Sequence, residues 1–224
     1  MTLLHAHAPP ALAILGWLIV VATVVHDARS VRGDFLRTSS AQHAWLAAIV
    51  TVALLWTMHV RSPVGMDFGL LGSALFALVF GRARAVLGLT AALLLYTALD
   101  DGVWFNAGIN AVVLGLVPAW LATALQRQIE RRLPKNLFVF IIGNGLFATL
   151  AATACGNALV LTLSAVESAG PTSAFGDHLA YSLLLAWGEA LMSGMLFSAL
   201  VVFTPHAVFT YRQDIYLPPR SPLA

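Results

Sequence analysis

The stretch from Met58 to Gly81, MHVRSPVGMDFGLLGSALFALVFG, joins a polar turn to an apolar run. Its first half carries a histidine, an arginine and an aspartate around Ser62, Pro63 and Gly65, which are residue types typical of turns. Its second half contains only small and apolar residues, and it is shorter than the roughly 20 apolar residues that a straight membrane span needs. We interpret the stretch as a hairpin between two spans, followed by a short helix packed inside a bundle.

The composition of the whole chain is that of an integral membrane protein. The 224 residues are 59% hydrophobic and 10% charged, whereas a soluble domain carries about 25% charged residues. We expect one integral membrane domain over residues 1–224, with a short cytoplasmic tail at 205–224. The single Cys155 excludes an internal disulfide and a cysteine metal cluster.

Hydrophobic segments predict an all-α, polytopic protein with about seven transmembrane helices. The third and fourth segments are expected to form a tight hairpin around Gly81 and Arg82, packed within the bundle. The segments are 10–26, 43–59, 66–81, 84–99, 108–126, 136–166 and 179–204.

The positions of lysine and arginine predict the orientation. With seven spans, all of the 12 basic residues except Arg61 fall on one side of the membrane. Because cytoplasmic loops carry an excess of these residues, we expect the N-terminus outside and the C-terminus inside. The expected location is the bacterial cytoplasmic (inner) membrane, crossed several times. The basic residues lie in short loops between apolar runs, so they indicate topology rather than binding of nucleic acid.

The outer side receives most of the histidines and many of the acids, which suggests capture of a cation. His5 and His7 lie two residues apart in the N-terminal segment, and neutral imidazoles are common ligands of transition metals. The turn in the opening stretch can bring His59 close to Asp67. Imidazole with carboxylate suits nickel, cobalt or zinc, and neighbouring methionines would favour copper. The alternatives are a solvated tail for the first pair and a helix cap for Asp67.

Three further polar residues are predicted inside the membrane. Asn110 should face the interior, because an amide exposed to lipid is costly. Glu189 lies in the middle of the last segment, and an ionisable group there is a functional candidate. His178 precedes Glu189 by about three helical turns and should project from the same face. The alternative for Glu189 is a structural role, hydrogen-bonded to Asn144, Asn157 or a backbone carbonyl.

The order of motifs resembles the CbiM/NikM family, the substrate-capturing permeases of energy-coupling-factor cobalt and nickel transporters. The resemblance rests on GLLGSALFALVFGRARAVLGLTAALLLYTALDDGVWFNAGINAVVLGLVPAW, with Phe80-Gly81, Asp101-Gly102 and Gly108-Ile-Asn110 at the family's positions. It covers residues 43–126, and more weakly 178–204, where WGEALMSGMLFSALVV is similar to the family's closing helix with its glutamate at Glu189. The resemblance implies a nickel or cobalt substrate, no tightly bound cofactor, a transmembrane coupling subunit and cytoplasmic ATPase subunits as partners.

The chain departs from that family at its metal ligands. It begins Met-Thr where the family begins Met-His, and Gly69 stands where the family has a ligand histidine before the LLGG motif. Our first hypothesis is a metal-capturing permease in which His5, His7, His59 and Asp67 replace the missing ligands, with zinc and copper left open. The alternative is a membrane scaffold or assembly subunit that kept the fold and lost the site. An enzyme is not expected, since no nucleophile or metal triad accompanies Glu189 and His178.

Overall fold

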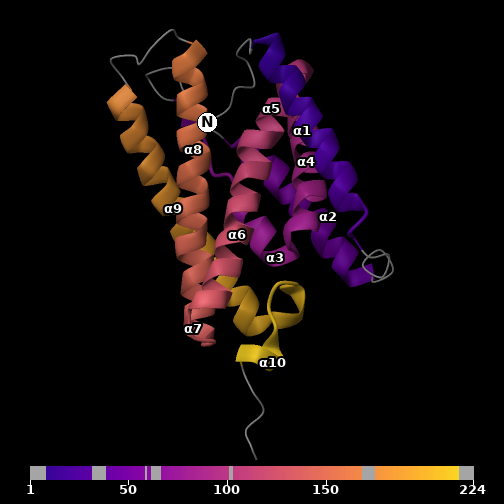
Figure 1. Cartoon of the computed structure of the whole chain (residues 1–224), viewed down its shortest axis with the longest axis vertical. Helices are drawn as coiled ribbons and strands as arrows, with labels where there is room; N and C mark the ends of the chain where they lie inside the picture. Colours follow the sequence, from indigo (N-terminus) through magenta and orange to yellow (C-terminus); the bar gives the residue numbers. More distant parts are fainter. Residues whose placement is uncertain are drawn as a thin grey trace, which may run out of the picture.

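The structure is a computed structural model that describes residues 9–31, 39–58, 60–61, 67–100, 103–167 and 175–216. Its helices run up and down side by side as an elongated bundle (Figure 1). Two pairs of residues form a minimal antiparallel strand pair, with Val60 opposite Phe68 and Arg61 opposite Asp67. The elements in chain order are α1 Pro10–Ala28, α2 Ser39–Thr57, β1 Val60–Arg61, β2 Asp67–Phe68, α3 Ser73–Phe80, α4 Arg82–Leu99, η2 Trp104–Asn106, α5 Ala107–Asn110, η3 Ala111–Leu116, α6 Val117–Arg132, α7 Leu137–Phe140, η4 Ile141–Ala148, α8 Thr149–Glu167, α9 Phe175–Phe203, η5 Pro205–Ala207 and α10 Gln213–Tyr216.

Six helical stretches of the described chain are long and apolar enough to cross a membrane: 10–28, 40–57, 82–99, 104–132, 137–163 and 176–203. They correspond to six of the seven predicted segments and confirm the all-α, polytopic class. The third predicted segment, 66–81, is the exception. Its helix, α3, has 8 residues and is about 12 Å long, which is less than half of a hydrocarbon core.

The helix expected over 66–81 begins seven residues later than predicted. Asp67 and Phe68 belong to β2, residues 69–72 form a loop, and Ser73 is the first helical residue. Gly72 has φ +66°, in the left-handed region that favours glycine, and this conformation separates the loop from the helix. Gly81 has φ +80° and forms the tight junction between α3 and α4 that the sequence predicted.

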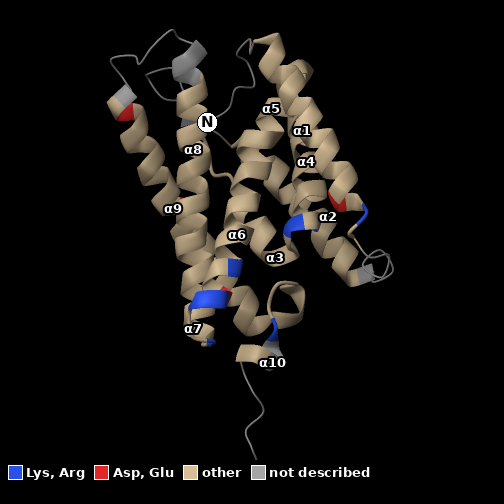
Figure 2. Cartoon of the chain, in the orientation of Figure 1, with Lys and Arg blue, Asp and Glu red and all other residues tan. Residues whose placement is uncertain are grey.

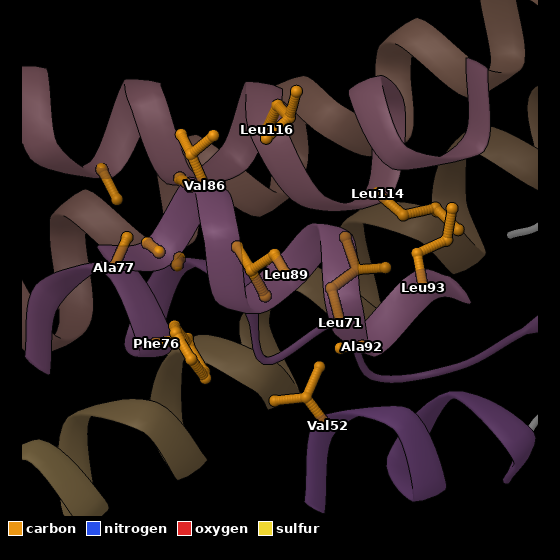
Figure 3. Packing of buried hydrophobic residues seen from close by; sticks show 14 of the residues in the cluster. Val52, Leu71, Phe76, Ala77, Val86, Leu89, Ala92, Leu93, Leu114 and Leu116 are labelled. Atoms are coloured by element: carbon orange, nitrogen blue, oxygen red, sulfur yellow. The ribbon is translucent and has the colours of Figure 1, made fainter. Parts of the chain in front are cut away.

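The short helix α3 lies in the core of the bundle. Seven of its eight residues are buried, and Figure 3 shows Phe76 and Ala77 among buried side chains of neighbouring elements such as Val86 and Leu89. The close contact with α4 requires Gly88, where an added Cβ would lie 2.5 Å from Cζ of Phe76. Small residues permit such approach inside a membrane, where packing replaces the hydrophobic drive between helices.

Two of the long spanning helices contain π-helical turns, η3 and η4. A π-helical turn shifts the hydrogen-bonding ladder by one residue, and such turns occur often at functional sites. In η3, the carbonyl oxygen of Leu114 accepts a hydrogen bond of 2.6 Å from Oγ of Ser73, the first residue of α3. The irregular turn of one helix therefore holds the start of another.

Charged residues are distributed unevenly along the bundle. Figure 2 shows most of the described lysines and arginines gathered toward the lower end, where α1, α6 and α9 end and α4 begins. This arrangement agrees with the one-sided basic pattern of the sequence. The prediction that this end faces the cytoplasm continues to rest on the positive-inside rule.

Candidate functional site: a loop held in the centre of the bundle

The loop at residues 69–72 connects the strand pair to α3 and ends deep inside the protein. Its two last amides point at one side chain from the opposite end of the sequence. The backbone N–H of Leu71 donates to Oε2 of Glu189 at 2.9 Å, and that of Gly72 donates to Oε1 at 2.9 Å. Glu189 lies in the middle of α9 and is 2% exposed. One carboxylate thus accepts both amides at the entrance to α3.

The local sequence explains why these amides are free to bind a carboxylate. The N–H groups of Leu71 and Gly72, the two residues immediately before α3, have no acceptor within that helix, and the helix dipole adds positive potential at this end. No side chain of the loop caps α3, and Gly72 lacks a side chain altogether. Glu189 supplies the missing acceptor from a separate helix. This pairing also gives the buried acid compensating hydrogen bonds, without which its burial would be very costly.

Two more residues fix the same loop. The indole Nε1 of Trp56, in α2, donates to the carbonyl oxygen of Leu71 at 2.7 Å. Ser73 Oγ donates to Leu114, as described above. Irregular backbone is tolerated at membrane depth where protein groups satisfy it, and here α2, α9 and η3 do so. The arrangement holds the base of the hairpin rigidly to three spanning helices.

Most of the predicted metal ligands lie outside the described residues. His5, His7 and His59 fall outside the described residues, and only the backbone of Asp67 is described. β2 places Asp67 opposite Arg61, two residues ahead of Gly69. Within the described residues, no group of three or more histidines, cysteines or acids is arranged to hold a metal. The candidate ligand set therefore stays a prediction.

The predicted intramembrane residues are buried but are not brought together. Asn110 is 1% exposed and His178 5% exposed, which agrees with the expectation that Asn110 faces the interior. His178 lies 11 residues before Glu189, and this spacing along α9 corresponds to about 16 Å. The two side chains thus share a helix without forming one site.

The hydrogen-bonding partners proposed for Glu189 were wrong. Its partners are the amides of Leu71 and Gly72 rather than Asn144, Asn157 or a carbonyl. Nδ2 of Asn157 instead donates to the carbonyl oxygen of Ser182 at 3.1 Å. The sequence contained no signal of this pairing. Glu189 and Leu71 lie 118 residues apart, and every residue type except proline carries the same backbone N–H donor.

Trp56 was also missed as a part of this site. A tryptophan in an apolar span carries an N–H that usually finds an acceptor when buried, so its position near the end of α2 was an available signal. Its acceptor, the carbonyl of Leu71, could not be inferred from the sequence.

The fold defines a multi-pass, α-helical membrane protein with a broken third helix held by buried polar contacts. A family model described as "CbiM: Cobalt uptake substrate-specific transmembrane region" matches residues 6–207. The chain belongs to this family. The comparison with curated proteins yields no match. Family membership makes the chain a transmembrane component of cobalt or nickel uptake, and so a transport component rather than an enzyme.

Proposed function

We propose that the chain is the substrate-capture permease of an energy-coupling-factor type transporter for a transition-metal cation, nickel or cobalt. The observation that carries this proposal is the loop before α3, which Glu189, Trp56 and Ser73 fix to three helices. A capture site needs ligands held in a set geometry, and rigid supporting contacts supply that geometry. The whole chain, 1–224, acts as one membrane domain in this proposal.

The proposed ligands are His5, His7, His59 and Asp67, which compensate for Gly69 at the position of the family's histidine. The backbone register supports a role for the hairpin, since β1 immediately follows His59 and β2 begins with Asp67. Both ligands of this pair are therefore attached to the same minimal strand pair. Imidazole and carboxylate donors together suit divalent nickel, cobalt or zinc.

The partners in this proposal are a transmembrane coupling subunit and cytoplasmic ATPases, in a bacterial inner membrane. The basic end of the bundle is the surface that would face these cytoplasmic subunits. Its described basic residues include Arg131 and Arg132 at the end of α6 and Lys135 just after it, all exposed. Positive charge at this end is consistent with a cytoplasmic orientation.

Metal binding by the purified full chain tests the proposal. Isothermal calorimetry in detergent with Co²⁺, Ni²⁺ and Zn²⁺ should give low-micromolar or tighter affinity for at least one ion. His59→Ala and Asp67→Asn should each weaken it at least about tenfold, because each removes one donor and a tenfold loss corresponds to about 1.4 kcal/mol.

The matched control is His206→Ala, which removes an exposed histidine at the opposite, basic end of the bundle. It should leave the affinity unchanged. The proposal fails if the wild-type chain binds none of the three ions below high-micromolar concentration, or if His206→Ala weakens binding as much as His59→Ala.

Gly69 favours a second function, that of a scaffold or assembly subunit that has lost its metal site. Glycine has no side-chain donor atom, and it stands at the position of the family's ligand histidine. Purification in mild detergent distinguishes the two functions. A stable complex with a membrane enzyme that lacks ATPase subunits, together with no bound metal in the isolated chain, would support the scaffold.

A further inference from the structure

The segment after the last spanning helix folds back under the bundle. Residues 208–216, the strap, follow η5 and include α10, and Figure 1 shows them in yellow beneath α3 at the basic end. The match to the family model stops at residue 207, so the strap lies beyond the region that the family description covers. Val208, the first residue of the strap, is 2% exposed and belongs to the hydrophobic core.

The strap completes the C-terminal end of α3. The last four carbonyl groups of a helix have no donor within the helix. The backbone N–H of Phe209 donates to the carbonyl oxygen of Val79 at 2.8 Å, and the hydroxyl of Thr210 donates to the carbonyl oxygen of Leu78. The strap therefore satisfies two of these four carbonyls of α3, and a buried acceptor left without a donor would be costly.

Aromatic side chains fix the strap on both sides of this contact. The ring of Phe209 stacks on that of Phe80, the last residue of α3, with 6.0 Å between ring centres. The ring centres of Tyr211 and Tyr216 lie 5.3 and 4.7 Å from that of Phe140 in α7. Such aromatic pairs add stability beyond the area that they bury. The strap thus joins the end of α3 to α7.

The packing of the strap is incomplete on the side toward α6. A pocket of about 250 Å³ lies between the two, lined by Ile215 and Tyr216 from the strap and by Glu130 and Arg131 from α6, among others. Segments with fewer buried contacts open at a lower free energy than the core of a protein. We therefore expect the strap to open more readily than the spanning helices.

The short helix α3 can move as one piece between its two ends. It is bounded by Gly72 and Gly81, which have φ +66° and +80° in the left-handed region. Hinges are a few residues at the ends of elements that absorb changes in backbone angles, and glycine accepts such changes readily. Glu189 holds the amides at the first end, and the strap holds the carbonyls at the second. A displacement at one end is therefore transmitted to the other, about 12 Å away.

We propose that the strap is a latch, which holds α3 in place and so keeps the loop at residues 69–72 ordered, and whose release loosens that loop. As a regulator of metal capture, the latch rests on the proposed function. The strap lies at the end predicted to face the cytoplasm, so a cytoplasmic partner that binds the released strap would loosen the loop. By linkage, metal bound at the loop would stabilise the latched strap.

Hydrogen exchange of the full chain in detergent, followed by mass spectrometry, tests the latch without metal. Thr210→Val removes the hydroxyl that binds Leu78 and keeps the shape of the side chain. Amide exchange should become about tenfold faster in the strap and also at residues 69–72, at the far end of α3. Thr210→Ser keeps the hydroxyl and should exchange as the wild type does. Exchange in α8, a spanning helix outside the latch, should not change.

The matched control is Thr204→Val. The hydroxyl of Thr204 donates to the carbonyl oxygen of Leu200 at 3.3 Å, outside the strap, so its loss should leave residues 69–72 unchanged. The proposal is overturned if Thr210→Val leaves exchange at residues 69–72 unchanged, if α8 exchanges faster to the same extent, or if Thr204→Val or Thr210→Ser has the same effect. Should Thr210→Val fail to fold, Phe209→Leu, which removes the stacking on Phe80, decides by the same comparison.

Metal affinity separates the latch from the proposed function. In a chain that binds Co²⁺, Ni²⁺ or Zn²⁺, Thr210→Val should weaken binding several-fold, and an unchanged affinity would overturn the regulatory role. A wild-type chain that binds none of these ions refutes the proposed function alone. Hydrogen exchange then still decides whether the strap holds the loop.

Discussion

At the scale of single residues, Glu189 determines how the centre of the bundle is held. Its two oxygens accept one amide each, from Leu71 and Gly72. An amide side chain offers one acceptor in place of two, and its own NH₂ would face one of the two N–H donors. The site thus distinguishes glutamate from glutamine, although the two side chains have nearly the same shape.

We expect Glu189→Gln to lower the free energy of unfolding by about 2 kcal/mol or more, because a buried donor left without an acceptor costs about 1–3 kcal/mol. Glu189→Ala should cost more, since it leaves both amides unsatisfied and opens a cavity. Thermal unfolding in detergent measures both changes. Asp177→Asn, an exposed acid in the first turn of the same helix, is the control and should change stability little. Equal stability of Glu189→Gln and Asp177→Asn would contradict the assigned role.

At the scale of elements, the sequence predicted the long helices well and the broken one only in outline. The length of an apolar run such as 84–99 predicts the length of its helix. The predicted start of α4 therefore lies within two residues of the observed start. The length of the run 66–81 did not predict the length of α3. The first half of this run is irregular backbone, which Trp56, Glu189 and Leu114 from distant elements stabilise. The hairpin before it was recognised from local turn residues, and its long-range anchors were not.

The crossing of α1 over α5 provides a test of close packing between elements. A Cβ at Gly16 would lie 2.4 Å from the backbone nitrogen of Ile109, and one at Gly108 would lie 2.6 Å from that of Trp17. Backbone atoms cannot move aside as a flexible side chain can. Gly16→Ala should therefore force the two elements apart and destabilise the protein by about 1–3 kcal/mol, the usual cost of overpacking.

The matched change for this test is Gly188→Ala in α9, where an added Cβ meets nothing within 4 Å. The same methyl group there should be neutral or slightly stabilising, because alanine favours a helix by up to about 1 kcal/mol over glycine. Thermal unfolding of the two variants in the same detergent gives the comparison. Equal melting temperatures for the two would show that α1 and α5 are not in the close contact that the structure describes.

At the scale of the whole molecule, the unequal ends of the bundle predict its orientation. Most of the described arginines and lysines gather at one end (Figure 2), and α9 begins at the other (Figure 1). The candidate capture hairpin comes directly after α2 in the chain and lies toward the end of the bundle where α9 begins. In the predicted orientation this end faces outside, where the substrate would arrive. The orientation and the proposed function therefore depend on the same asymmetry.

Cysteine labelling in intact cells tests this orientation directly. Asp177→Cys, at the start of α9, should react with a membrane-impermeant maleimide, because the predicted orientation places it outside. Arg131→Cys, at the end of α6, should react only after the membrane is permeabilised. The natural Cys155 lies within the spanning part of α8, so the wild-type chain supplies the background. Labelling of Arg131→Cys in intact cells, with Asp177→Cys protected, would reverse the orientation. The proposed capture hairpin would then face the cytoplasm, where it could not receive a metal ion for uptake.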